Sequence, residues 1–181
     1  LVDAPLLTGG SGLGGAVARQ LAARDPGKFA KGKQQGPAAG KTILFSGSCS
    51  EMTNRQVAAY AAQAPVFRVD VGQCRDRAEA YAREAADWAE KNAGARAPLI
   101  SATVSPDALK EVQARYGAAV AAEAVEDFFR LLALAMRDRG YVNFIVAGGE
   151  TSGSVAGALD VGAFRIGPEI APGVSWVDAL D

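Results

Sequence analysis

The chain has 181 residues, of which 49% are hydrophobic and 22% are charged, and its formal net charge is −1. This hydrophobic content argues against a disordered chain, and the balanced charge argues against nucleic acid or an anionic membrane surface as the main partner. Histidine is absent, which excludes Ser-His-Asp and Cys-His catalysis and removes the commonest metal ligand.

Strands and helices are predicted to alternate along the chain. The first half is expected to contain a short strand at residues 4–7, a helix ending at about residue 24, an exposed connection at 25–40, a strand at 42–45, a helix at 52–63 and a strand at 66–71. The second half is expected to contain a helix at 75–91, a strand at 99–104, a helix from Pro106, a helix at 118–139, a strand at 142–147, a helix at 154–159 and a strand at 163–166.

This alternation, with continuous apolar strands, predicts an α/β fold: a three-layer, mostly parallel sheet with helices on both faces. The apolar face of the helix at 118–139 is so wide that we expect this helix to be largely buried. The connection at 25–40 is rich in Gly, Pro, Lys and Gln, which makes it the best candidate for a domain boundary.

Three glycine- and hydroxyl-rich segments each follow an apolar strand. They are Thr-Gly-Gly-Ser-Gly at residues 8–12, Ser-Gly-Ser-Cys-Ser at 46–50 and Gly-Gly-Glu-Thr-Ser-Gly at 148–153. One such turn is ordinary in an α/β protein, whereas three at the carboxyl ends of strands suggest one sheet edge lined with N–H and O–H donors. Glycines before a helix N-terminus predict a phosphate cradle, and hence a nucleotide.

Within the last segment, Gly148 and Gly149 would let the backbone pass close to the phosphates. Thr151 or Ser152 would cap the helix, and either hydroxyl could donate to a phosphate oxygen. Glu150 has three interpretations: it helps to hold Mg²⁺ through water, it orients the ribose, or it is a solvent-facing acid near a helix N-terminus.

Metal and cysteine chemistry are restricted by composition. Any metal would be a hard ion such as Mg²⁺, held by carboxylate, hydroxyl and phosphate oxygens. Cys49 and Cys74 have no metal spacing and form no disulfide framework, so we expect a reduced, cytoplasmic chain. No apolar segment is long enough to span a bilayer.

Two familiar nucleotide-binding motifs match the sequence only in part. Gly10, Gly12 and Gly15 fit the dinucleotide fingerprint G-x-G-x-x-G, but the acidic residue that should end the next strand is missing and the intervening connection is too long. A Walker A loop is excluded, because Gly-Lys-Thr at residues 40–42 precedes its strand. The sequence therefore favours a nucleotide-binding domain without a P-loop.

The set of motifs resembles the C-terminal nucleotide-binding domain of the four-carbon acid sugar kinases. The resemblance covers about residues 41–181 and is carried by the segments 46–50 and 147–153, Thr53 and Gln56, Arg-Ile-Gly-Pro-Glu-Ile at 165–170 and Pro-Gly-Val at 172–174. Residues 1–40 resemble the tail of the preceding sugar-acid-binding domain. The domain expectation is therefore 1–40 and 41–181, with both ends cut from a longer protein.

The resemblance implies ATP-dependent phosphorylation of a 3-oxo-tetronate, threonate or erythronate at its terminal hydroxyl. It implies ATP contacts from Ser46 or Ser48 and from four further residues, and sugar-acid contacts from the segment that contains Gly10 and Ser11. The four further residues are Gly148, Gly149, Glu150 and Thr151. It assigns no catalytic base, and it implies a Lys-Ser-Gly-Asn-Phe-Gly segment beyond residue 181.

The sequence leaves three hypotheses about function open. The first is the ATP- and Mg²⁺-dependent kinase domain, the second an NAD(P)-dependent oxidoreductase built on residues 10–15, and the third a non-catalytic nucleotide-binding domain. The expected partners are ATP and a small sugar acid, without nucleic acid or membrane. A second copy of the chain, in a homo-oligomer, is a further candidate partner.

Overall fold

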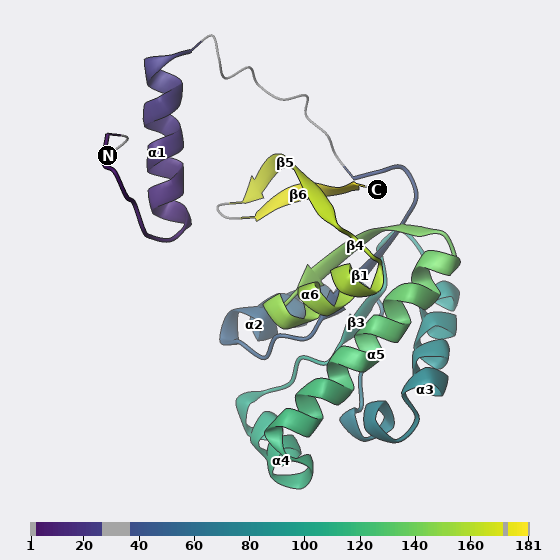
Figure 1. The fold of residues 1–181 in the computed structure, drawn as a ribbon. Coiled ribbons are helices and arrows are strands. Elements are labelled where there is room, and N and C mark those ends of the chain that lie inside the picture. The colour runs from purple at the N-terminus through teal and green to yellow at the C-terminus, as the bar shows by residue number, and fades with distance from the viewer. Residues whose placement is uncertain (1–2, 27–36, 172–173, 181) are drawn as a thin grey trace. The chain divides into compact units, whose positions relative to one another are not determined.

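The computed structural model describes residues 3–26, 37–171 and 174–180, without the side chain of Ser11 (Figure 1). These residues form two compact units. One unit comprises residues 38–162, and the other combines the N-terminal segment up to residue 37 with residues 163–180.

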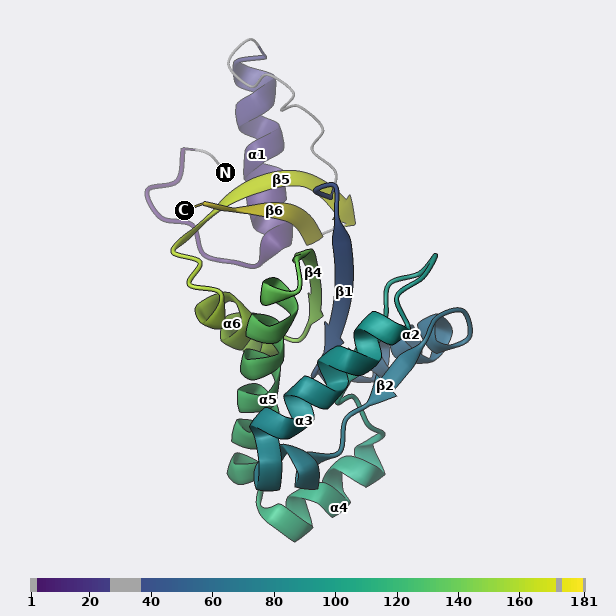
Figure 2. The ribbon, with the colours of Figure 1, turned by 90° about the vertical axis from the view of Figure 1, so that its right-hand side faces the viewer.

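The unit of residues 38–162 contains a four-stranded, wholly parallel sheet in the order β2-β3-β1-β4. The strands are β1 (Lys41–Ser46), β2 (Val66–Arg68), β3 (Leu99–Ser101) and β4 (Tyr141–Ala147). The helices are α2 (Glu51–Ala61), α3 (Val71–Lys91), α4 (Pro106–Tyr116), α5 (Ala118–Asp138) and α6 (Gly149–Ala158). Helices α3 and α5 cover one face and α2 the other, as Figures 1 and 2 show. The predicted α/β class is confirmed.

The core lies between the sheet and the paired helices α3 and α5. Four alanines of α3 are buried, so its backbone approaches α5 closely; they are Ala82, Ala85, Ala86 and Ala89. From α5, Phe128, Phe129 and Leu132 are fully buried. The ring of Phe129 lies 5.3 Å from that of Phe45 in β1, which fixes α5 against the centre of the sheet.

Polar side chains define the starts of three helices. Ser50, Asp70 and Ser105 each accept a hydrogen bond from the backbone N–H three residues on, at the N-termini of α2, α3 and α4. The helix opening at Ser105-Pro106 is thus confirmed. Asp70 thus serves as the N-cap of α3.

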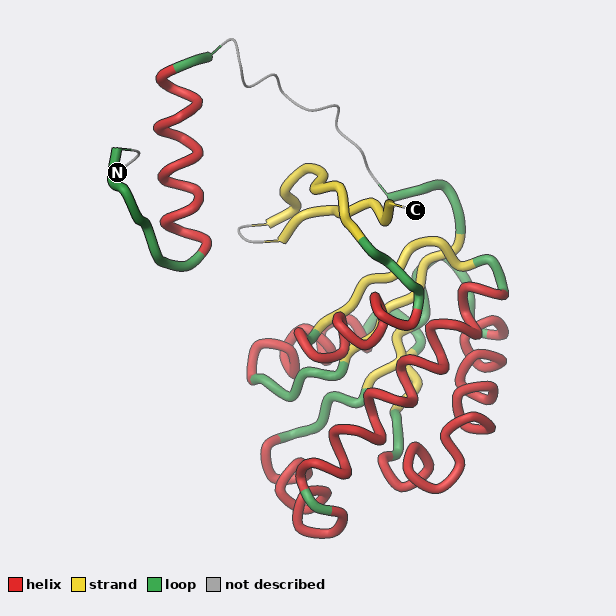
Figure 3. Tube along the Cα trace, viewed as in Figure 1, coloured by secondary structure: helices red, strands yellow, loops and turns green. Residues whose placement is uncertain are grey.

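Several predicted elements differ from the structure, among them β2, β3 and α3, whose bounds are shifted by three or four residues at one end. Residues 4–7 form no strand, and Figure 3 shows the described segment before α1 (Ser11–Arg24) as loop. Helix α6 begins at Gly149, five residues earlier than expected, so Glu150 and Thr151 lie in its first turn. The expected strand at 163–166 is the start of an antiparallel hairpin of β5 (Ala163–Ala171) and β6 (Val174–Leu180).

Candidate nucleotide-binding site

The site lies where β1 and β4 end side by side. Ser46 and Ala147, the last residues of the two strands, are register partners. Beyond them, the N–H groups of Gly47 and Ser48 both donate to the carbonyl of Ala147, at 3.0 and 3.3 Å. The β1–α2 loop then leads to one face of the sheet, and α6 packs against α5 on the other. This divergence at the carboxyl edge creates the crevice in which α/β sheets bind ligands.

The N-terminus of α6 supplies donors to this crevice. Gly148 precedes the helix with φ of +128°, a backbone conformation that residues other than glycine rarely adopt. The first helical bond runs from Ser152 N–H to Gly148 C=O at 2.9 Å, which leaves the N–H groups of Gly149, Glu150 and Thr151 without an acceptor in the helix. Helix geometry also places a partial positive charge there.

The expected side-chain cap of this helix is wrong. The N-terminus of α6 has no side-chain cap, and the Ser152 hydroxyl instead donates backwards to the carbonyl of Gly148 at 2.7 Å. Thr151 is only 5% exposed. Among the described residues, no side chain therefore caps the free N–H groups.

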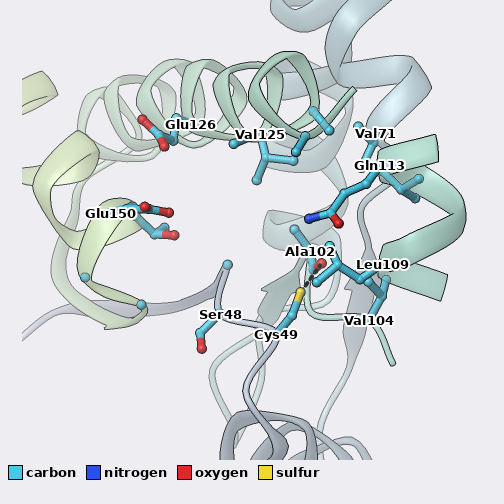
Figure 4. Close-up of a pocket in the computed structure, with 18 residues that line it drawn as sticks. Ser48, Cys49, Val71, Ala102, Val104, Leu109, Gln113, Val125, Glu126 and Glu150 are labelled. Carbon is cyan, nitrogen blue, oxygen red and sulfur yellow. Dashed lines mark hydrogen bonds between the residues drawn. The ribbon is translucent and has the colours of Figure 1, made fainter. Parts of the chain in front are cut away.

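A cavity of 540 Å³ opens in front of these groups (Figure 4). Its polar end contains Ser48, Glu126 and Glu150, together with the glycines of both loops. The rest of the lining is mainly apolar and comes from the start of α3, the residues after β3, α4 and α5; these side chains are Val71, Ala102, Val104, Leu109, Val112, Ala118, Ala121, Ala122 and Val125. Figure 4 shows Val71, Val104 and Leu109 at the end opposite Glu150. The division into an anion-binding end and an apolar end matches the chemistry of a nucleotide.

The two candidate serines have different surroundings. Ser46 is 2% exposed, and its hydroxyl pairs with that of Thr103 at 2.5 Å, which in turn donates to the carbonyl of Ser48 at 2.8 Å. Ser46 therefore stabilises the β1–α2 loop through Thr103 and does not line the cavity. Ser48 lines the cavity, and its hydroxyl oxygen accepts bonds from Ser50 N–H and from the Thr53 hydroxyl.

Three further hydroxyl side chains, in and after β3, are also used within the protein. Ser101 and Thr103 are buried, and the Ser101 hydroxyl accepts from the N–H of Thr103. Ser105 caps α4. These three side chains build the loop after β3 and do not form a row of ligand donors.

Glu126 is a cavity residue that the sequence did not reveal. It projects from α5 and accepts a hydrogen bond from the Ser154 hydroxyl of α6 at 3.4 Å. Figure 4 shows the carboxylates of Glu126 and Glu150 at the same end of the cavity. Within the described residues, no group of three or more acidic, Cys or His side chains could hold a metal. A magnesium ion would therefore need phosphate oxygens besides these two carboxylates, which is its usual arrangement with nucleotides.

Helical spacing in the sequence groups the remaining lining residues on one face of each helix, but it does not show whether the protein or a ligand covers that face. Leu109, Val112 and Gln113 share one face of α4 at helical spacing, and the N-terminal half of α5 adds Val125 and several alanines. The sequence assigned this part of α5 to the core. The fully buried side chains of α5 lie in its C-terminal half, whereas several residues of its N-terminal half line the cavity.

The N-terminal glycine segment is organised differently from the nucleotide loops. Gly10 precedes α1, and with Leu7, Gly9, Leu13, Gly14 and Val17 it lines an open cavity of 440 Å³. The side chain of Ser11 lies outside the described residues, so the sugar-acid contacts of Gly10 and Ser11 stay predictions. The dinucleotide fingerprint needs a strand before its glycines, and the described residues have none there.

No helix among the described residues combines the length and the apolarity that a membrane crossing needs. The expectations of a reduced, cytoplasmic chain and of a second copy as partner stay predictions.

Known proteins provide an independent comparison. The family model of a nucleotide-binding C-terminal domain matches residues 43–181. A 3-oxo-tetronate kinase of Salmonella typhimurium is 48% identical over 99% of this chain, and one of Escherichia coli is 48% identical over 95%. This chain spans 43% and 44% of those relatives, which is less than half their length.

Among solved structures, the crystal structure of a Salmonella typhimurium LT2 protein superposes with a TM-score of 0.87 and 48% identity. The match covers 99% of this chain and 42% of that one. The arrangement of the two strand ends and the agreement in sequence lead to one assignment. This chain belongs to the nucleotide-binding C-terminal domains of the four-carbon acid sugar kinase family.

Proposed function

We propose that the cavity binds ATP with Mg²⁺, and that the full-length protein phosphorylates a four-carbon sugar acid, 3-oxo-tetronate or a close relative, at its terminal hydroxyl. The observation that carries the proposal is the free N-terminus of α6. Its first N–H groups, preceded by the positive-φ residue Gly148, open onto a cavity of nucleotide size. Bound ATP supplies the phosphoryl group for the transfer.

The residues at the polar end have separable roles in this proposal. The N–H groups of Gly149, Glu150 and Thr151 bind the phosphates and offset their charge, which is most of what phosphoryl transfer asks of a protein. The Glu150 carboxylate lies in the same helical turn and would repel a bare triphosphate, so we assign it to the magnesium ion. Ser48 replaces Ser46 as the serine that meets the nucleotide.

The sugar-acid specificity is proposed from the relatives, both of which are named 3-oxo-tetronate kinase. Because this chain spans less than half of their length, the phosphorylation belongs to the full-length protein in this proposal. Gly10 and Ser11 stay the proposed sugar-acid contacts.

Two glycines of α6 provide a matched test. A Cβ atom added at Gly149 or at Gly157 would meet no atom within 4 Å, so Gly149→Ala and Gly157→Ala should both fold. Only Gly149 lines the cavity, where a methyl group would obstruct the approach of a phosphate. We expect Gly149→Ala to weaken Mg·ATP binding by about tenfold or more, equivalent to ~1.4 kcal/mol, and Gly157→Ala to leave it unchanged.

Isothermal titration of this chain with Mg·ATP measures both constants, and NAD serves as the comparison ligand. At 100-fold saturation, ATP should raise the free energy of unfolding by ~2.7 kcal/mol, while NAD should have no effect. Equal ATP affinities of the two variants, or stabilisation by NAD and not by ATP, would refute the assignment of the cradle.

A further inference from the structure

The apolar end of the cavity contains one carboxamide. Gln113 projects from α4, and Figure 4 shows its side chain directed into the cavity near Leu109, Val104 and Ala102. Its position follows from helical spacing, because Leu109, Val112 and Gln113 are at i, i+3 and i+4 on α4. No residue of α4 is buried, Gln113 is exposed, and all three of these side chains line the cavity.

Gln113 lies at the end of the cavity away from the N-terminus of α6, where the base of a bound nucleotide would be. A nucleotide whose phosphates lie on the α6 N-terminus has its base at the other end of the same cavity, between α4 and α5. That end offers alanine, valine and leucine side chains to the faces of a planar ring, while the Gln113 carboxamide meets its edge. Base sites commonly combine apolar walls with a few placed polar groups.

The chemistry of a carboxamide fits adenine. Its carbonyl accepts from the exocyclic amino group of the base, and its NH₂ donates to the adjacent ring nitrogen, as glutamine does in protein–DNA contacts. Among the described residues no protein group hydrogen-bonds to this carboxamide, so both of its hydrogen-bonding groups are available. We propose that Gln113 is the residue that recognises the base of ATP, an inference that rests on the proposed nucleotide function.

A free carboxamide also has a consequence for selectivity. Rotated by half a turn, it offers its donor to the guanine O6 and its acceptor to guanine N1–H. Since no neighbouring group fixes the rotation of the carboxamide, Gln113 should bind adenine and guanine with only a small difference in affinity. A carboxylate at this position would behave differently, because it accepts two hydrogen bonds from guanine and repels the lone pair of the adenine ring nitrogen.

The test is to measure dissociation constants for Mg·ATP, Mg·GTP and inorganic tripolyphosphate by isothermal titration. We expect Gln113→Leu to weaken both nucleotides about tenfold while tripolyphosphate binds as in the wild type. Gln113→Glu should move the ratio of ATP to GTP affinity by about tenfold toward GTP. The matched controls are Gln63→Leu and Gln63→Glu, at an exposed position that does not line the cavity, and these should change nothing.

The outcomes separate the two proposals. Wild-type protein that binds neither ATP nor tripolyphosphate overturns the nucleotide function and this inference with it. Wild-type protein that binds ATP, together with an unchanged ATP to GTP ratio in Gln113→Glu or unchanged nucleotide affinity in Gln113→Leu, overturns the role of Gln113 alone. Equal losses of nucleotide and tripolyphosphate in Gln113→Leu would mean a general disturbance of the cavity, and would likewise overturn it.

Discussion

The backbone of Gly47 lies directly against the side chain of Thr151, so that a Cβ atom at Gly47 would overlap the Thr151 hydroxyl. This contact joins the loop after β1 to the first turn of α6. Gly148 also lies close to this hydroxyl, since an added Cβ there would be 3.2 Å from Thr151 Oγ1 and 3.2 Å from Ser48 N. Two glycines of the two loops thus lie close to one buried threonine, and this packing limits movement of the first turn of α6.

The first prediction concerns this contact. We expect Gly47→Ala to lower the free energy of unfolding by ~1–3 kcal/mol, the usual cost of overpacking, and to weaken ATP binding because α6 must shift. The double variant Gly47→Ala/Thr151→Ala removes the overlapping hydroxyl and should recover part of both losses. Denaturant unfolding and ATP titration of the four proteins in this cycle give the coupling, and strictly additive losses would show that the contact is unimportant.

The second prediction separates the two serines. Ser46→Ala removes a buried hydroxyl pair and should lower the free energy of unfolding by ~1 kcal/mol with little change in ATP affinity. Ser48→Ala should instead weaken ATP binding with a smaller effect on stability, since its hydroxyl is at the cavity. Chemical denaturation and ATP titration of both variants check this. A larger loss of ATP affinity in Ser46→Ala than in Ser48→Ala would reverse the assignment.

The third prediction assigns the acid in the first turn of α6. Removing the charge in Glu150→Gln should strengthen the binding of metal-free ATP, because repulsion of the triphosphate disappears, and should weaken the dependence of ATP binding on Mg²⁺. Titrations with ATP in EDTA and in increasing Mg²⁺ measure both effects. Glu123→Gln, at an exposed acid of α5 that does not line the cavity, is the control. An unchanged Mg²⁺ dependence would leave the ribose or the solvent as the partner of Glu150.

The fourth prediction uses the two thiols as reporters. Burial raises the pKa of Cys74 to about 12, so at pH 8 only about one molecule in 10⁴ carries its reactive thiolate. Cys49 lines the cavity and is partly exposed. Ellman's reagent should therefore modify one thiol in the native protein, which Cys49→Ser removes, and two after unfolding. Mg·ATP should slow the native reaction, and a native reaction rate that saturating Mg·ATP leaves unchanged would place the nucleotide elsewhere.

The sheet was predictable because its strands are short apolar runs bounded by glycine and proline, such as Ile43 to Phe45 before Gly47. The start of α6 was not, because Gly149, Gly153 and Gly157 have low helix propensity and the helix depends on packing against α5. The hairpin strand Val174–Leu180 was missed because its sequence lacks strict alternation of apolar and polar residues.

The site was predicted in part for a related reason. The glycine loops carry their chemistry in the residue types, so Gly148 to Thr151 could be named from sequence. Helical periodicity shows that Leu109 and Gln113 share a face, but not whether protein or ligand covers it. Glu126 and the buried pair of Ser46 with Thr103 depend on which elements meet in space, which a single sequence does not show.

The central claim is that the N–H groups from Gly149 to Thr151 bind the phosphates of ATP. The most direct measurement is a titration of ¹⁵N-labelled protein with Mg·ATP, followed by the backbone amide resonances. The account predicts the largest shifts at residues 148–151, with a second group at Leu109–Gln113 and no response at Gly157. Saturable ATP binding that leaves the amides of residues 148–151 unmoved would contradict it.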